Sequence, residues 1–191
     1  MPLEFAKLPT LETDRLILRG WQWSDLASFA DMNADPEVMK FFPSTRTQAE
    51  SDQWVANLQG KIRETGFGPH VVSIKGGADF IGFVGLSKVM FETDFTPAIE
   101  IGWRLSREAW GKGYASEAAR EALRFGFAEK GLEDILSFAP KINLGSIGVM
   151  QKIGMKQDAK PEFTHPSLDA NSPLNPCVLY RAQKADFGSG L

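Results

Sequence analysis

The sequence predicts an α/β fold of the α+β kind, in which helices cover both faces of a mixed, mostly antiparallel sheet. Three observations support this prediction. One β-prone run precedes two or three helical patterns, three strand patterns then follow one another through short turns, and a strand–helix–strand crossover comes next. The chain has 191 residues, so a single domain (1–191, core about 10–185) is expected.

Seven short runs of β-prone residues predict the strands of this sheet. They are Leu16–Arg19, His70–Ile74, Phe80–Leu86, Ala98–Leu105, Ile135–Ala139, Met155–Gln157 and Val178–Arg181. The second, third and fourth runs are expected to form an antiparallel meander. Gly102 interrupts the fourth run, and a glycine inside a strand often marks a bulge or a close approach to the backbone.

Helix-start signals predict the helices between these strands. Ser24 and Asn143 are candidate N-caps, Pro36 suits a first helical turn, and Thr47 with Glu50 fits a capping box. The tail after Lys184 is expected to be loose.

The helix that follows the fourth strand run has the clearest pattern. It is expected to begin near Ala115 and to end at Lys130-Gly131. Its apolar positions recur at helical spacing: Ala115, Ala118, Ala119, Ala122, Leu123 and Phe127. Its other face is charged, with Glu117, Arg120, Glu121 and Arg124.

A glycine turn, Trp110–Glu117, opens this helix. Gly111 and Gly113 allow positive φ, so backbone N–H groups can converge on an anion, and the helix start adds free N–H groups. A nucleotide P-loop is excluded, because it needs glycine at Ser106 and a hydroxyl at Gly113. A dinucleotide fingerprint needs glycine at Ser116 and matches weakly.

Composition excludes several classes. A net charge of −3 and a pI near 5.5 argue against nucleic-acid binding or adhesion to anionic membranes. No run approaches the ~18 apolar residues of a membrane span, so a cytoplasmic location is expected. Cys177 suits a buried strand position, and two histidines with one cysteine predict no metal site.

Four segments together resemble the GNAT superfamily of acyl-CoA N-acyltransferases, and within it the branch of ribosomal-protein-alanine N-acetyltransferases. They are Thr13–Arg19, Glu100–Trp103 with Leu105, Trp110–Ala118, and Asn143 with Ser146 running to Lys152–Met155. The resemblance implies a splayed sheet of six to seven strands, with acetyl-CoA as cosubstrate.

The resemblance also implies which residues hold coenzyme A. The pyrophosphate is expected on the N–H groups of about Gly111 to Ser116, and the pantetheine arm on the backbone of Trp103 and Leu105. The predicted cofactor-binding residues are Trp103, Leu105, Trp110, Gly111, Lys112, Gly113, Tyr114, Ala115, Ser116 and Asn143. Asn143 as a cap alone and Lys112 as a solvated lysine remain alternatives.

The sequence departs from the family at two positions. Trp110 stands where Gln or Arg is common, so binding is expected to rely on the backbone. Met150 stands where many members carry a tyrosine as general acid. Because no tyrosine stands at this position, a non-catalytic acyl-CoA-binding or sensing domain is a second hypothesis for the function. A nucleotide-dependent enzyme is a third hypothesis, which is disfavoured because the glycine turn fits neither the P-loop nor the dinucleotide motif.

Two residues are the catalytic candidates. Glu100 is a carboxylate inside an apolar strand, and partial burial would raise its pKa toward that of a general base. Its alternative is a side chain facing solvent or paired with an arginine. The resemblance implies that Ser146 donates to the leaving sulfur or bridges to it through water, and the alternative is an ordinary first-turn serine.

The acceptor is expected to be a primary amine, either a small molecule or a protein N-terminus. Aromatic and histidine side chains from the first half of the chain are candidates for its pocket: Trp21, Phe41, Phe42, Phe67 and His70. Most are expected to be core and one or two to line the site. A loop around Phe163–Pro166 is the candidate for the opposite wall, and the protein is expected to be a monomer or a homodimer.

Overall fold

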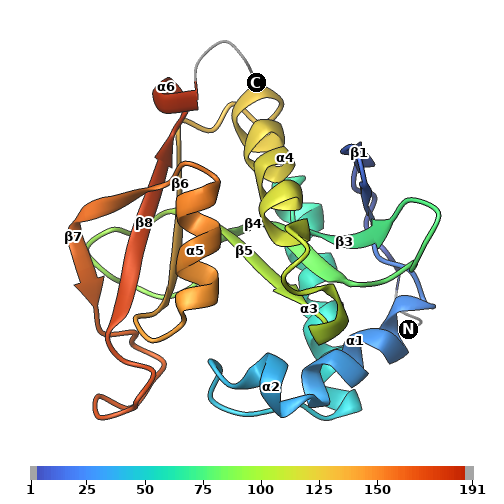
Figure 1. Cartoon of the computed structure of the whole chain (residues 1–191), viewed down its shortest axis with the longest axis horizontal. Coiled ribbons are helices and arrows are strands. Elements are labelled where there is room, and N and C mark those ends of the chain that lie inside the picture. The colour runs from blue at the N-terminus through green and yellow to red at the C-terminus, as the bar shows by residue number, and fades with distance from the viewer. Residues whose placement is uncertain (1–3, 188–191) are drawn as a thin grey trace.

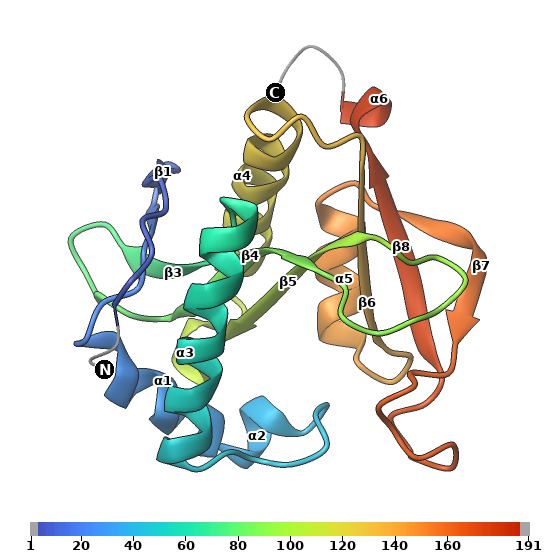
Figure 2. The same cartoon turned by 180° about the vertical axis from the view of Figure 1, so that it is seen from behind.

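The computed structural model describes residues 4–187. It has an eight-stranded sheet in the order β1-β2-β3-β4-β5-β6-β8-β7, with helices on both faces (Figures 1 and 2). The strands are β1 (Leu11–Glu12), β2 (Leu16–Arg19), β3 (Pro69–Ile74), β4 (Gly82–Lys88), β5 (Ile99–Leu105), β6 (Asp134–Pro140), β7 (Lys156–Phe163) and β8 (Cys177–Gln183). The helices are α1 (Asp25–Ala34), α2 (Pro36–Met39), α3 (Gln48–Thr65), the 3-10 turn η1 (Arg107–Ala109), α4 (Tyr114–Ala128), α5 (Leu144–Lys152) and α6 (Lys184–Phe187).

The predicted fold class is confirmed, and three details of the strand and helix assignment differ. The sheet has eight strands rather than six to seven, because the short β1 pairs with β2. β7 is longer than the predicted run and continues to Phe163, since it pairs with β8 again after a register shift between Gln157 and Glu162. Lys184 begins the short helix α6, where a loose tail was expected.

Each face of the sheet carries its own hydrophobic core. On the face shown in front in Figure 1, α4 packs its small residues Ala118, Ala119 and Ala122 against β-strand side chains such as Leu18 and Ile101. Its alanines permit this close approach because they add little bulk. On the other face, α1 and α3 cover β3 and β4, and Figure 2 shows α3 crossing that side.

Strand β5 pairs with β4 without a bulge, so the bulge expected at Gly102 is absent. The register runs unbroken from Gly82↔Leu105 to Lys88↔Ile99, with Gly102 opposite Gly85. Two hydrogen bonds beside β5 join even-numbered residues to the β4 side, from Ser106 N to Ile81 O and from Val89 N to Ala98 O. Because backbone direction alternates along a strand, the even-numbered residues of β5 direct their N–H and C=O groups at β4. Odd-numbered residues therefore direct their backbone groups toward β6.

The sheet opens between β5 and β6. These strands are parallel, as predicted, and within residues 4–187 the one pair that joins them is Glu100↔Leu136. Beyond that pair the strands diverge (Figure 2). The odd-numbered residues Trp103 and Leu105 thus present backbone N–H and C=O groups to a gap in the sheet. None of the helices in the part of the chain described here is long and apolar enough to span a bilayer.

Candidate active site

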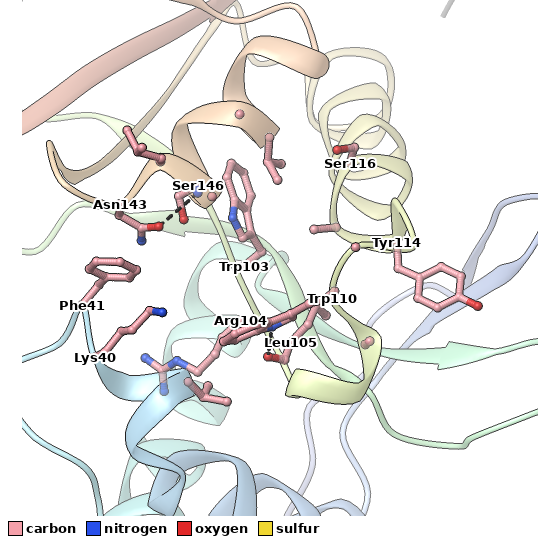
Figure 3. Close-up of a pocket in the computed structure, with 18 of the residues that line it drawn as sticks. Lys40, Phe41, Trp103, Arg104, Leu105, Trp110, Tyr114, Ser116, Asn143 and Ser146 are labelled. Carbon is pink, nitrogen blue, oxygen red and sulfur yellow. Dashed lines mark hydrogen bonds between the residues drawn. The ribbon is translucent and has the colours of Figure 1, made fainter.

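A cavity of about 700 Å³ lies where the sheet opens (Figure 3). Its walls come from the end of β5, the glycine turn, α2 and the start of α5. Nine of the ten predicted cofactor residues line it: Trp103, Leu105, Trp110, Gly111, Gly113, Tyr114, Ala115, Ser116 and Asn143. Lys112 is exposed and lies outside the lining.

The glycine turn has the backbone geometry that the sequence predicts. Gly111 and Gly113 have φ of 73° and 81°, which residues with a Cβ rarely adopt. Gly113 is the N-cap of α4, and the first intrahelical bond runs from Glu117 N to Gly113 O. The N–H groups of Tyr114, Ala115 and Ser116 therefore have no partner inside the helix and can bind an anion.

Contacts from the connection between β1 and β2 support this turn. The carboxylate of Glu117 accepts bonds from Thr13 Oγ1 at 2.6 Å and from Arg15 Nε at 2.7 Å. Arg15 Nη1 also donates to Lys112 O at 3.0 Å. Burial favours protonation of Glu117, but these bonds from Thr13 and Arg15 outweigh it and lower the pKa. The sequence pattern places Glu117 on the charged face of the helix but does not show these partners, which are more than 100 residues away.

One backbone acceptor at the gap is already used. Trp110 Nε1 donates to Leu105 O at 2.8 Å, so the indole lies along the end of β5. A pantetheine amide that pairs with Leu105 O must displace this indole or share the carbonyl with it. Trp110 is 42% exposed, so the ring has room to move.

Helix α5 supplies the opposite wall of the gap. Asn143 is its N-cap, and Asn143 Oδ1 accepts from Ser146 N at 3.1 Å (Figure 3). The capping prediction is confirmed. Ser146 lies in the first turn of the helix and lines the large cavity and a second, smaller one.

The second cavity, of about 240 Å³, adjoins the first. Six residues line both cavities: Phe41, Phe42, Trp103, Arg104, Asn143 and Ser146. The predicted base Glu100 lines only the second. Burial raises the pKa of its carboxyl to about 7, against a weak opposing effect of Lys61. A carboxyl with such a pKa can accept a proton near neutral pH.

The predicted acceptor residues divide as expected between core and site. Phe41 and Phe42 line both cavities. Trp21 is core, and Phe67 packs against the core beneath α4. His70 is buried at 1% exposure against Phe125, and burial lowers its pKa to about 4 despite bonds to backbone carbonyls.

The loop around Phe163–Pro166, which was expected to close the acceptor pocket, lines neither cavity, and Phe138 of β6 takes that place in the second cavity. Phe163 and His165 lie outside the cavity lining and pack against Phe138, which lines the second cavity. Met150, at the position of the missing tyrosine, is buried and lines that cavity too. Cys177 is buried, and burial raises the pKa of its thiol to about 11, as suits a structural cysteine.

Arg104 is the site residue that the sequence interpretation missed. It stands on β5 at an even-numbered position, on the same face as Glu100 and Gly102, and it lines both cavities. The signal was available, because a second charged residue four positions after Glu100 must share its face of the strand.

Comparison with known proteins agrees with this geometry. Residues 15–156 match the family model described as an acetyltransferase (GNAT) domain. The FsC-acetyl coenzyme A-N(2)-transacetylase of Aspergillus fumigatus is 37% identical over 161 residues, which cover 77% of this chain and 65% of that protein. The aligned region thus spans a little under two thirds of that relative.

Solved structures share the architecture. A GNAT-family acetyltransferase from Bacillus anthracis matches with a TM-score of 0.75 and 26% identity, covering 93% of this chain and 99% of that one. The ribosomal-protein-S5-alanine acetyltransferase of Vibrio fischeri matches with a TM-score of 0.72 and 19% identity, covering 93% and 98%. This second likeness is one of fold alone, so it does not single out the ribosomal-protein branch.

Proposed function

Because this chain belongs to the GNAT acetyltransferase family, whose members use acetyl-CoA, we propose that it transfers the acetyl group to the nitrogen of a primary amine. The acceptor is a small amine or a protein N-terminus. The observation that carries the proposal is the meeting of two cavities at the gap between β5 and β6. One has the features of a cofactor site, and the other contains a carboxyl with a raised pKa.

The large cavity fits coenzyme A in two respects. The free N–H groups at the start of α4 suit the pyrophosphate, and the backbone edge of Trp103 and Leu105 suits the amides of the pantetheine arm. Acetyl-CoA supplies the acetyl group as a reactive thioester. With the phosphates at the glycine turn, an arm lying along β5 leads toward the junction of the cavities, near Ser146.

Glu100 acts as the general base in this proposal. Its carboxylate takes a proton from the acceptor ammonium, directly or through a water, and the free amine then attacks the thioester carbonyl. The C–N bond forms as the C–S bond breaks, and the second nitrogen proton leaves for the sulfur. Ser146 Oγ donates a hydrogen bond to the sulfur as negative charge develops on it. The walls hold the two reactants together, which supplies much of the rate.

Two measurements test this function. Calorimetry with acetyl-CoA, coenzyme A, ATP and NAD is expected to show binding of the first two alone. Incubation with acetyl-CoA and a library of amines and peptides is then expected to release free thiol together with an N-acetyl product. Tight acetyl-CoA binding without turnover of any acceptor would instead support the acyl-CoA-sensing alternative, for which the buried Met150 is the motivating observation.

A further inference from the structure

The guanidinium of Arg104 is held in place at the junction of the two cavities. Its Nη1 donates to Asn33 Oδ1 at 2.6 Å. Its central carbon lies 4.0 Å from the ring centre of Phe42 and 5.5 Å from that of Phe83. These contacts fix the plane of the group, since arginine stacks on aromatic faces. Figure 3 shows the side chain reaching from β5 toward α2.

Arg104 carries its charge without a carboxylate partner. The ion pairs among residues 4–187 include none for Arg104. Two carboxylates that follow Asn33 in the chain have their own cations, because Asp35 pairs with Arg107 and Glu37 with Lys40. Burial lowers the pKa of Arg104 to about 9, so the group stays charged at neutral pH.

One edge of the guanidinium has no hydrogen-bond partner among the described residues. Nε is buried and has no hydrogen-bond partner within the described residues. Nη1, on the far edge, is taken by Asn33. The edge formed by Nε and Nη2 is the edge that a carboxylate binds with two parallel hydrogen bonds. A buried donor without a partner lowers stability unless a ligand supplies the missing hydrogen bond.

Glu100 and Arg104 are the two charged residues that line the smaller cavity. Gly102 lies between them on the same face, and a Cβ placed there would meet nothing within 4 Å. The floor between the two charges is therefore bare backbone, over which a ligand chain can lie. Such a cavity is complementary to a molecule with an amine at one end and an anion at the other.

We propose that Arg104 binds a carboxylate of the acceptor, so that the enzyme acetylates amino acids or related amino carboxylates in preference to otherwise identical neutral amines. This inference rests on the proposed amine acetylation. The amine end lies toward Glu100 and the carboxylate lies against the Nε edge of Arg104. The spacing between amine and carboxylate decides which member of a homologous series fits.

The test compares matched acceptors. A series of ω-amino carboxylates, and an α-amino acid with its amide, are each paired with the amine that lacks the carboxylate. For at least one pair, wild-type kcat/KM is expected to favour the carboxylate about tenfold or more, as for a charge-assisted bidentate contact. Arg104→Gln is expected to remove most of this preference, and Arg104→Lys to keep part of it.

Two further variants separate binding from folding. Asn33→Asp places a carboxylate beside Nη1 and is expected to reduce the preference, with the arginine still present. Arg107→Gln changes a nearby cation outside both cavities and is expected to keep the wild-type preference. Thermal melting confirms that each variant is folded. A wild-type ratio near one for every pair, or an unchanged ratio in Arg104→Gln, overturns the proposal.

Calorimetry keeps this inference distinct from the proposed reaction. The same pairs are titrated into the wild type and Arg104→Gln in the presence of coenzyme A. If no amine is acetylated but the carboxylates bind the wild type more tightly than they bind Arg104→Gln, acetyl transfer fails and the carboxylate site stands. If the carboxylates bind both proteins equally, or neither, the carboxylate site is refuted.

Discussion

Arg15 Nε lies 2.7 Å from Glu117 Oε2, a contact that joins the connection between β1 and β2 to the helix after the glycine turn. Arg15 also lies over the ring of Tyr114, with 4.8 Å between its central carbon and the ring centre. The turn that is proposed to hold the pyrophosphate is thus supported by a residue nearly 100 positions earlier in the chain. Cofactor affinity should therefore depend on this contact, although neither Arg15 nor Glu117 lines the cavity.

Replacing Glu117 with alanine is expected to weaken coenzyme A binding and to lower stability by about 1–3 kcal/mol, because Thr13 and Arg15 lose their acceptor. Calorimetry and denaturant titration measure the two effects. Glu121→Ala on the same helix is the matched control, since Glu121 bonds Arg124 away from the turn. Equal losses of affinity in both variants would show that helix stability alone is responsible.

The rate of acetyl transfer is expected to rise with pH through an apparent pKa of about 7, the value for Glu100, because the base acts in its ionised form. Glu100→Gln should lower kcat about 10²- to 10⁴-fold. It should also remove the rise of the rate with pH near 7. If the variant is slower but its rate still rises with pH near 7, another group is responsible for the pH dependence. Glu108→Gln, outside both cavities, is the control.

Glu100 is also expected to make the protein less stable as pH rises. Its folded pKa of about 7 exceeds the ordinary value of 4.5 for a glutamate, so the folded state binds the proton more tightly than the unfolded chain. Stability should therefore fall between pH 4.5 and 7, by at most about 3 kcal/mol for this shift. Glu100→Gln should flatten that fall, so the stability of the variant relative to the wild type should be higher near pH 8 than near pH 4. Denaturant titrations of both proteins across this range measure it, and parallel curves would contradict the assignment.

Gly102→Ala is expected to fold normally and to lose activity. The added methyl group meets no protein atom but projects between Glu100 and Arg104, over the bare backbone where the acceptor is proposed to lie. KM for the acceptor should rise while coenzyme A affinity is kept. Gly82→Ala gives the contrasting result, because its φ is 132° and the new Cβ would collide with Arg104 O. That variant should lose about 2 kcal/mol or more of stability.

Ser146→Ala is expected to lower kcat about tenfold or more, the size of one hydrogen bond to a charged group. Its backbone N–H, which Asn143 caps, remains, so stability and coenzyme A affinity should change little. Asn143→Ala, by contrast, should cost about 1 kcal/mol of stability through the lost cap. Stopped-flow thiol release with matched calorimetry separates the two. An unchanged kcat in Ser146→Ala would leave Ser146 as an ordinary first-turn serine.

The sequence by itself determined the parts of this protein that depend on local patterns. The periodic alanines of α4, the positive φ at Gly111 and Gly113, the Asn143 cap and the succession along the chain of the seven predicted strands and the main helices follow from residue types and spacing. These features are local, because backbone propensity and short-range hydrogen bonds fix them.

Only the tertiary structure decided what those elements face. It placed Glu117 against Arg15, left Gly102 without a bulge and with an open face, and put His70 in the core. It also brought Arg104 together with Asn33 and Phe42, which come from segments about 60 to 70 residues away. Strand periodicity specifies which residues share a face, whereas packing between distant segments determines whether that face meets a helix, solvent or a cavity.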